Sequence, residues 1–415
     1  MAETLVVRPD RKFVEEIIAS GGGDLKHCMQ CATCSVACEL SDGRPFPRKE
    51  MIWAQWGLKD HLFADPDVWL CHQCNDCSKR CPRGARPGDV LAAVRRRTIE
   101  HYAFPRALAR WVNRPAFLPL LLLAPALLLG LALLARDPVQ NAFGFHEHPG
   151  FYADFFPHWL LIAFFGFFTT LALVVAAAGV IRFWRAMKAE DAAAGGGAVA
   201  AGILASLGGA LGSILTHDRF GRCEAQASRR VVHLALFYGF LALYVVTLWA
   251  VVDIYVMPAL GVASRYPFDL AHPMKVLANV GGVVMIFGAA KAMTDRRRPG
   301  AGTPAGTAFD WVFVWLVMGV GVTGFAAEVF RFTVGPEPGA ALTATAYAVY
   351  FAHLVLVFQL LVYLPYSKFA HVLYRTVAMV YAERTGRNPP ARRRPPALRA
   401  APHRPAVHAG GSPPT

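Results

Sequence analysis

The cysteine pattern constrains this chain most. Eight of its nine cysteines lie in two copies of the spacing Cys-x2-Cys-x2-Cys-x3-Cys, namely Cys28, Cys31, Cys34 and Cys38, then Cys71, Cys74, Cys77 and Cys81. In this pattern the first three thiolates of a run bind one [4Fe–4S] cluster, and the fourth binds the cluster of the other run. The spacing therefore predicts two clusters, one held by Cys28, Cys31, Cys34 and Cys81 and the other by Cys71, Cys74, Cys77 and Cys38. Such a chain carries electrons.

Two other uses of cysteine fit this spacing less well. Structural zinc sites combine two Cys-x2-Cys pairs, or Cys with His, without further cysteines at these intervals. A disulfide framework requires an oxidising compartment, whereas residues 1–20 are charged and amphipathic and do not resemble a secretory signal. Pro82 follows Cys81 as cluster motifs favour, although Glu39 follows Cys38.

The distribution of apolar residues predicts a membrane domain. The chain is 55% hydrophobic, more than a soluble globular protein of 415 residues needs. Six stretches are each close to the roughly 20 residues that cross a bilayer as a helix. They cover residues 117–135, 158–181, 231–257, 273–292, 309–330 and 344–365.

Charge sets the expected orientation. The net charge of +14 does not indicate nucleic acid binding, because the basic residues flank the apolar stretches. They gather in 182–230, 293–308 and the segment after 365, whereas the intervening loops hold only Arg136, Arg265 and Arg331. The positive-inside rule therefore predicts a multi-pass protein of the cytoplasmic membrane with both termini in the cytoplasm. A seventh span over 195–215 would reverse the downstream loops, so we interpret this segment as a linker and a surface helix.

The predicted fold is mainly α-helical and has four parts. Residues 1–101 form a small all-α domain with two [4Fe–4S] clusters, and 102–116 form a basic connector on the membrane surface. Residues 117–380 form a six-helix transmembrane haem b bundle. Residues 381–415 form a disordered basic tail that contacts membrane lipid.

Histidines are the main candidate ligands in the membrane domain. His353 and His371 lie 18 residues apart, which is five helical turns or about 27 Å. If the last helix continues past Pro365, both lie on one face, as two stacked b-type haems would require. His233 is at the same depth as His371, which predicts an inner haem between them.

The outer haem is less defined. His353 would share it with His158 or His272, and spacing does not separate these two, although a helix start at His158 would direct that side chain inward. For every histidine the alternative is an interfacial side chain bound to water or backbone. His217 and Cys223 lie in an inner loop, where they border a cofactor or are surface residues. Lys275 either extends to the outer interface or binds a haem propionate or a quinone carbonyl.

These motifs together resemble known redox families. The N-terminal hundred residues resemble the small iron–sulfur subunit of heterodisulfide reductase through the two cysteine runs. The membrane part resembles the haem b subunit of heterodisulfide reductase and the gamma subunit of respiratory nitrate reductase through His-x17-His at His353 and His371. The fusion over about residues 10–380 resembles the fused membrane subunit of the quinone-interacting membrane-bound oxidoreductase complex. One departure is Leu243, where the nitrate reductase pattern has a histidine ten residues after the first.

The resemblance implies a function as an oxidoreductase subunit. It implies exchange of electrons between menaquinone and cytoplasmic flavin/iron–sulfur subunits, which serve adenylylsulfate reductase in dissimilatory sulfur metabolism. The expected path runs from quinone near the outer haem to the inner haem, the clusters and the partner. Two alternatives stay open: an anchor of a heterodisulfide reductase-like or sulfite-reduction-linked complex, and a non-enzymatic redox-sensing protein.

Overall fold

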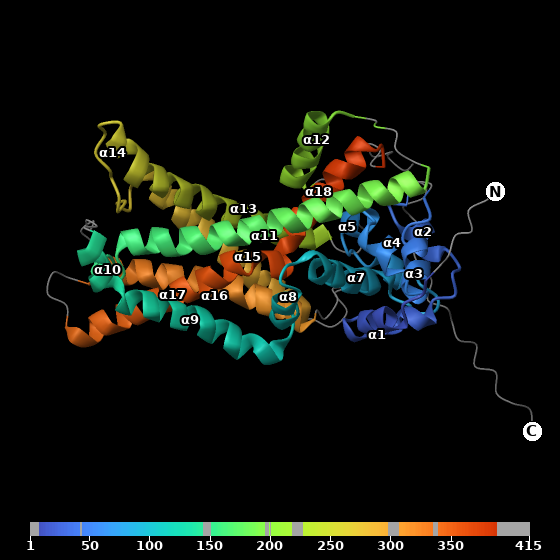
Figure 1. Ribbon diagram of the computed structural model, residues 1–415, viewed down its shortest axis with the longest axis horizontal. Coiled ribbons are helices and arrows are strands. Elements are labelled where there is room, and N and C mark those ends of the chain that lie inside the picture. Colours follow the sequence, from blue (N-terminus) through green and yellow to red (C-terminus); the bar gives the residue numbers. More distant parts are fainter. Residues whose placement is uncertain are drawn as a thin grey trace, which may run out of the picture.

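The computed structural model describes residues 8–41, 44–143, 151–195, 199, 201–217, 227–297, 307–334 and 339–387. None of these residues lies in a β-strand, which confirms the mainly α-helical fold. Figure 1 shows short N-terminal helices gathered at one end of a bundle of long helices. Cys223 and the tail beyond residue 387 lie outside the described residues.

The N-terminal domain is built from short helices around the cysteine runs. Asp10 caps the first of them, because its carboxylate accepts the N–H of Phe13 at 3.0 Å, and Gly21 ends it in a conformation with φ of +109°. The helices are α1 (Arg11–Ala19), η1 (Gly23–His27), α2 (Thr33–Ala37), α3 (Arg48–Gln55), α4 (Lys59–Phe63), α5 (Asp67–Leu70), α6 (Asp76–Lys79) and α7 (Pro87–Tyr102).

Among the described residues, six long apolar helices form the bundle, each long and apolar enough to cross a membrane. They are α9 (Leu118–Leu134), α11 (His158–Ala193), α13 (Ala227–Val251, extended by η5, Val252–Val256, and α14, Met257–Ala259), α15 (Pro273–Arg297), α16 (Ala308–Thr333) and α17 (Ala340–Val362). The connector forms α8 (Arg106–Val112) and η2 (Pro115–Phe117), and α10 (Arg136–Phe143) follows α9.

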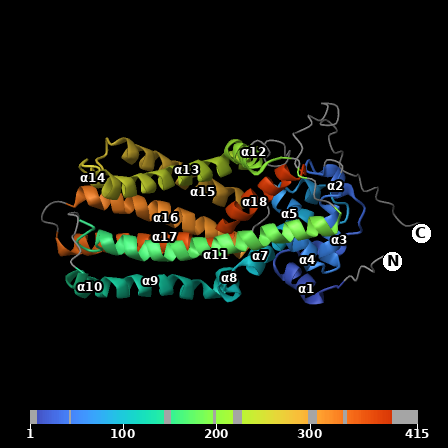
Figure 2. The ribbon, with the colours of Figure 1, turned by 45° about the horizontal axis from the view of Figure 1, so that its top comes forward.

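The apolar segment after residue 195 is too short to cross the membrane. It forms α12 (Ile203–Thr216), whose 14 residues extend about 21 Å at 1.5 Å per residue. A bilayer core is about 30 Å thick. Helix α12 packs instead against α18 (His371–Arg384) at the end of the bundle nearest the N-terminal domain (Figure 2).

The last helix is broken, which corrects one expectation. Helix α17 ends at Val362, and two short turns, η6 (Leu364–Tyr366) and η7 (Lys368–Ala370), precede α18. Pro365 has no N–H to donate and its ring crowds the preceding turn, so the helix does not continue. His353 and His371 therefore lie on two different helices. Helix α18 also continues to Arg384, beyond the predicted start of the tail at 381.

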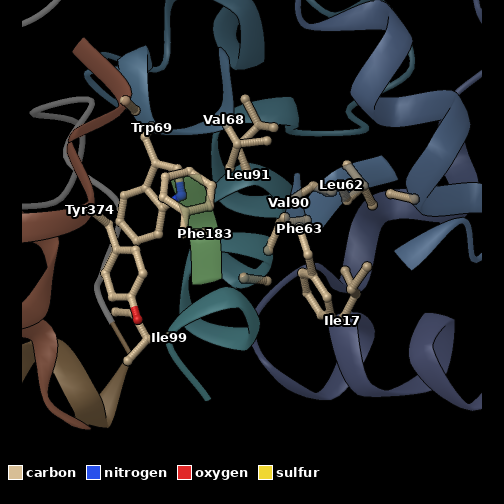
Figure 3. Close-up of a cluster of buried hydrophobic side chains, with 14 of the residues drawn as sticks. Ile17, Leu62, Phe63, Val68, Trp69, Val90, Leu91, Ile99, Phe183 and Tyr374 are labelled. Atoms are coloured by element: carbon tan, nitrogen blue, oxygen red, sulfur yellow. The ribbon is translucent and has the colours of Figure 1, made fainter. Parts of the chain in front are cut away.

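The two parts of the molecule share a hydrophobic core. Phe13, Ile17 and Met51 are buried in the N-terminal domain, and the same cluster continues to Phe183 of α11 and Tyr374 of α18. Figure 3 shows Trp69, Phe183 and Tyr374 packed together at this junction, with Trp69 stacked on Tyr374 and Phe183 edge-on to both. The domain is thus fixed against the bundle by continuous packing.

Helix α11 strengthens the junction because it is longer than a bilayer requires. Its 36 residues extend about 54 Å, so its last turns run beside the N-terminal domain (Figure 1). Nδ1 of His61 lies 2.5 Å from Glu190, and the hydroxyl of Tyr381 donates to Asp191 at 2.5 Å. These polar contacts hold α4, α11 and α18 together.

Candidate electron-transfer centre

The second predicted set of cysteines surrounds one cavity. Cys38 comes from the end of the first run, yet it lies with Cys71, Cys74 and Cys77 around about 610 Å³ of space. Helices α2 and α6 pack against each other and bring the two runs together. The chain thus forms a cradle with four sulfur ligands from both runs, as the exchange of the fourth cysteine requires.

The first set also assembles. Cys28, Cys34 and Cys31 interact with one another, and Cys81 interacts with Cys28. Cys31 is exposed, whereas Cys34 is buried. None of Cys38, Cys71, Cys74 and Cys77 is exposed, so the second set lies deeper in the domain than the first.

The backbone repeats in the two runs. Gln30 and Ala32 have positive φ angles of 60° and 65°, and the equivalent Gln73 and Asn75 have 53° and 66°. Two left-handed residues in each run turn the chain so that three cysteines point to one side. Each of these four non-glycine residues destabilises the fold by about 1–3 kcal/mol in this conformation. Such backbone strain is tolerated at sites where a bound ligand fixes the chain.

The sulfur atoms accept hydrogen bonds and lie in apolar surroundings. The N–H groups of Gln73 and Ala85 donate to Cys71 and Cys81 at 3.3 Å each. Burial raises the pKa of the Cys34 thiol to about 11 and raises the pKa values of Cys28, Cys38 and Cys77. Buried thiols keep their protons unless a metal replaces them, so iron binding would release protons.

Two predicted histidines meet at the end of the bundle nearest the N-terminal domain, which we call the inner end. The ring centroids of His233 on α13 and His371 on α18 are 6.4 Å apart, and their planes are nearly perpendicular at 85°. A ring nitrogen lies about 2 Å from a bound metal, so two rings on opposite sides of one ion have centroids about 6–6.5 Å apart. At this separation the two rings would be able to hold one metal ion, such as the iron of the predicted haem.

Hydrogen bonds fix which nitrogen of each ring faces the other. Nδ1 of His371 donates to the carbonyl of Lys368 at 2.6 Å, and Nδ1 of His233 lies 2.7 Å from Nε2 of His217. Burial lowers the pKa values of His217 and His371, the latter to about 4, so both are neutral near pH 7. Nε2 is then the nitrogen that could bind iron, with the second nitrogen oriented by a neighbour.

Two arginines join these histidines to the second cysteine run. Arg229 of α13 donates to the carbonyl of Gln73 at 2.7 Å. Arg375 of α18 donates to the carbonyls of Trp69 and Cys71, at 3.1 Å each. Each arginine is four residues, about one turn, from the histidine on its own helix. The deeper cysteine site is therefore held against both histidine-bearing helices.

The described contacts of the predicted outer histidines are with other residues. Nδ1 of His353 lies 3.0 Å from the hydroxyl of Thr323, and a Cβ at Gly324 would lie only 3.1 Å from the His353 ring. His158 bonds the Tyr255 hydroxyl at 3.0 Å, and His272 stacks on Phe268 with centroids 4.3 Å apart. The contacts described for His158 and His272 are thus with other groups, and an outer haem stays a prediction.

Lys275 is paired inside the membrane domain. Its ammonium lies 2.8 Å from the carboxylate of Glu328, and the two side chains are only 15% and 16% exposed. The amide of Asn279 donates to the same carboxylate at 2.9 Å. Lys275 thus has a partner on α16, which neither interpretation of the sequence included.

Several residues of this centre are missing from the sequence predictions. The sequence predicts Arg229 and Arg375 only as basic residues at the cytoplasmic surface, and it does not indicate Glu328. Each arginine lies four residues from a candidate histidine, and this spacing is the one sequence feature that could have indicated its role. His217 is predicted from the sequence to border a cofactor or to lie at the surface, but its contact with His233 is not.

Comparison with protein families decides the relationship of the membrane part. The family model described as citrate utilization protein B matches residues 112–392. The chain belongs to this family. A second model, a 4Fe–4S dicluster domain, matches residues 24–85 and includes all eight cysteines of the two runs. The protein therefore joins an iron–sulfur domain to a membrane region of the citrate utilization protein B family.

Individual relatives reflect both parts. Citrate utilization protein B of Escherichia coli is 30% identical over 329 residues, which cover 75% of this chain and 80% of that protein. A subunit of the H(2):CoB-CoM heterodisulfide,ferredoxin reductase of Methanothermobacter marburgensis is 39% identical over 87 residues, 21% of this chain and 47% of that protein. A protein of Archaeoglobus profundus, described as similar to a heterodisulfide reductase subunit, is 42% identical over 95 residues, 22% of this chain and 50% of that protein.

The chain spans about half the length of the two heterodisulfide reductase relatives. Its N-terminal domain is thus of the type found in the iron–sulfur subunits of heterodisulfide reductases, an electron-transfer domain in redox complexes. No solved structure matches the chain.

Proposed function

We propose that the protein is a membrane subunit that transfers electrons between a quinone, such as menaquinone, and a soluble flavin/iron–sulfur partner. Haem b would be the one-electron carrier in the bundle, held by His233 and His371. The clusters would be bound by Cys28, Cys31, Cys34 and Cys81, and by Cys71, Cys74, Cys77 and Cys38. The protein would position these cofactors and set their potentials, and the cofactors would supply the redox chemistry.

One observation carries this proposal. The helices that bear His233 and His371 each send an arginine, Arg229 and Arg375, to the loop of Cys71 and Gln73. A haem at the histidines would lie beside the deeper cluster, which is the arrangement that short-range electron transfer requires. A redox sensor or scaffold has no need of such a junction.

The surface cluster would face the partner. Cys31 is exposed, and the nearby apolar side chains of Met29 and Val36 are 66% and 74% exposed. Exposed apolar residues beside a redox centre favour docking of another protein. The path would run from the inner haem to the deeper cluster, to the surface cluster and to the partner. Both clusters would lie on the cytoplasmic side, as the charge distribution favours.

The pathway served by this transfer has two candidates. A link to adenylylsulfate reductase follows from the resemblance of the fused architecture to the quinone-interacting oxidoreductase family. A link to the utilization of citrate is favoured by the name of the relative that aligns over most of both chains. We favour the second, because the heterodisulfide reductase relatives align with only about a fifth of the chain.

Cofactor counting tests the function. Purified protein should contain two four-iron clusters and at least one haem b, by iron determination and pyridine haemochrome. His233→Ala should lose one haem and keep the clusters, whereas His146→Ala should lose neither. His353→Ala and His158→Ala then test for an outer haem. Protein without haem would overturn the proposal. Growth of a deletion strain on citrate, compared with growth on a sulfur compound, would separate the two pathways.

A further inference from the structure

A second cavity lies at the inner end of the bundle, away from the cysteines. It contains about 550 Å³ of space, including its mouth, and lies between the connector and α9 on one side and α16 with η7 on the other. The residues that line it, rather than its volume, indicate what it could bind.

The walls suit a lipophilic ring. They are formed by Leu118, Leu121, Phe309, Val312, Phe313 and Leu316, and the helices α9 and α16 that carry these residues are both of membrane-spanning length. Flat aromatic and branched apolar side chains favour a planar apolar ligand. A ligand dissolved in the membrane could therefore enter between these helices.

An acceptor without a partner lines the cavity. The amide of Asn113 donates to the carbonyl of Ala109 at 2.6 Å and to Glu100 at 3.2 Å, which fixes its orientation. Its Oδ1 atom is buried and has no hydrogen-bond partner among the described residues, although Asn113 is only 2% exposed. A buried polar atom of this kind costs about 1–3 kcal/mol, so it points to a missing donor such as the hydroxyl of a ligand.

A donor lies on the same wall. Lys368 lines the cavity, and its ammonium bonds the carboxylate of Asp310. A carbonyl oxygen at the cavity could accept a hydrogen bond from this ammonium. The neighbouring amide of Gln359 is already used, because it donates at 2.8 Å to the carbonyl of Leu121. That carbonyl lacks its helical donor because residue 125 is a proline.

The cavity is next to the inner histidine. The carbonyl of Lys368 accepts the hydrogen bond from His371, and Phe369 stacks on Phe313 with centroids 6.0 Å apart. Arg96 of the N-terminal domain lies 5.5 Å from the ring centroid of Phe309. One short segment therefore separates the cavity from the candidate haem site.

We propose that this cavity binds the head group of a lipophilic quinone. The inference rests on the proposed function and places the quinone at the inner end of the bundle, whereas the sequence predicts it at the outer haem. Quinone reduction takes up two electrons, passed singly through the His371 side, and two protons from water at the cluster-domain side, and forms two O–H bonds. Quinol oxidation reverses these steps, with Lys368 donating to the quinone carbonyl and Asn113 accepting from the quinol hydroxyl.

Filling the cavity tests the proposal on the complete protein. Leu316→Trp and Leu118→Trp place an indole in it from opposite walls, so failure of one variant to fold leaves the other. Val322→Trp on the exposed face of α16 is the matched control. The probe is a short-chain naphthoquinol, and the readout is the rate at which it reduces the haem absorption. Dithionite reduction and cofactor content show that each variant is intact.

The expected result is a fall of about tenfold or more in the quinol-dependent rate for either intact cavity variant, with Val322→Trp unchanged. Wild-type rates in both cavity variants would overturn the quinone site and leave the proposed function standing. If dithionite reduces the wild-type protein but no quinol does, the proposed function itself would be overturned. Mass spectrometry of the lipids that copurify with each variant gives a second criterion. If the cavity variants lose a bound phospholipid but no quinone, the quinone site would also be overturned.

Discussion

His217 is placed to tune the proposed haem site without binding the cofactor itself. Its Nε2 lies 2.7 Å from Nδ1 of His233, and burial keeps it neutral near pH 7 by lowering its pKa. Its Nε2 can thus accept a hydrogen bond from Nδ1–H of His233, which would make that ring a stronger ligand for the proposed haem. Partners of this kind typically change metal affinity about 10–100-fold.

His217→Ala should therefore weaken haem binding and raise the midpoint potential of the inner haem, because a less electron-rich ligand favours reduced iron. Pyridine haemochrome and a redox titration measure the two effects. His217→Gln, which retains an amide oxygen as acceptor, should give a smaller change. Haem content and potential equal to those of the wild type in His217→Ala would contradict this assignment.

Glu328 and Lys275 present a different residue-level question, because a buried ion pair costs much of what it gains. Removal of one partner leaves the other charge unpaired. Glu328→Gln should lower stability by about 3–5 kcal/mol, measured by thermal unfolding in detergent. The double variant with Lys275→Met should recover most of this loss. A single variant as stable as the wild type would show that the pair is not buried in the membrane.

Among the helices, α18 has the most varied contacts. It begins with His371, continues with Arg375 at the cysteine loop and packs Tyr374 on Trp69 with centroids 5.1 Å apart. It starts as a separate helix because Pro365 ends the preceding one. The change of direction turns α18 away from the bundle and toward the N-terminal domain (Figure 2).

Arg375→Gln should slow electron transfer between haem and clusters without removing either cofactor. Its guanidinium donates to three backbone carbonyls, those of Trp69, Leu70 and Cys71, and an amide cannot replace this set. Stopped-flow spectroscopy after quinol addition should show normal haem reduction and delayed cluster reduction. Arg384→Gln, near the end of the same helix, is the control and should behave as the wild type. Equal delays in both variants would argue against a specific role.

Close packing of α13 on α15 also positions His233. A Cβ at Gly239 would lie 2.7 Å from the carbonyl of Gly281, so a larger side chain cannot fit there without separating the helices. This contact explains how two apolar helices approach closely at that level. It also fixes the height of His233 relative to α15.

At the scale of the whole molecule, the sequence predicts the local structural patterns, but it predicts only some of the contacts between residues far apart in the chain. The cysteine runs predict their own geometry because three ligands lie within a short stretch of chain. The six apolar stretches follow from helix length and bilayer thickness. The contact between His233 and His371 could be predicted because both histidines lie at the same depth in the predicted membrane. The break at Pro365, the arginines at the cysteine loop and the Lys275–Glu328 pair depend on tertiary packing that no spacing in one sequence specifies.

The junction between domain and bundle should respond to acid through His101. Its ring lies between Phe63 and Tyr102, with centroids 4.5 and 4.8 Å away, and burial lowers its pKa to about 4. The folded state favours the neutral ring, so its stabilising effect is present above the ordinary pKa of 6.5 and is lost as pH falls toward 4.

Thermal unfolding followed by cluster absorption should therefore show a steeper fall in melting temperature with acid for the wild type than for His101→Phe. The comparison between the two proteins cancels the acid lability of the clusters themselves. Parallel curves for the two proteins would contradict this role of His101.

The haem held by His233 and His371 is the proposed connection between quinone and the two clusters, and everything else in the electron path depends on it. The most direct measurement is electron paramagnetic resonance of the clusters after addition of a naphthoquinol, in wild-type protein and in His371→Ala. We expect reduced clusters in the wild type and none in His371→Ala, while dithionite reduces the clusters of both. If quinol reduces the clusters of His371→Ala at the wild-type rate, that result would contradict this connection.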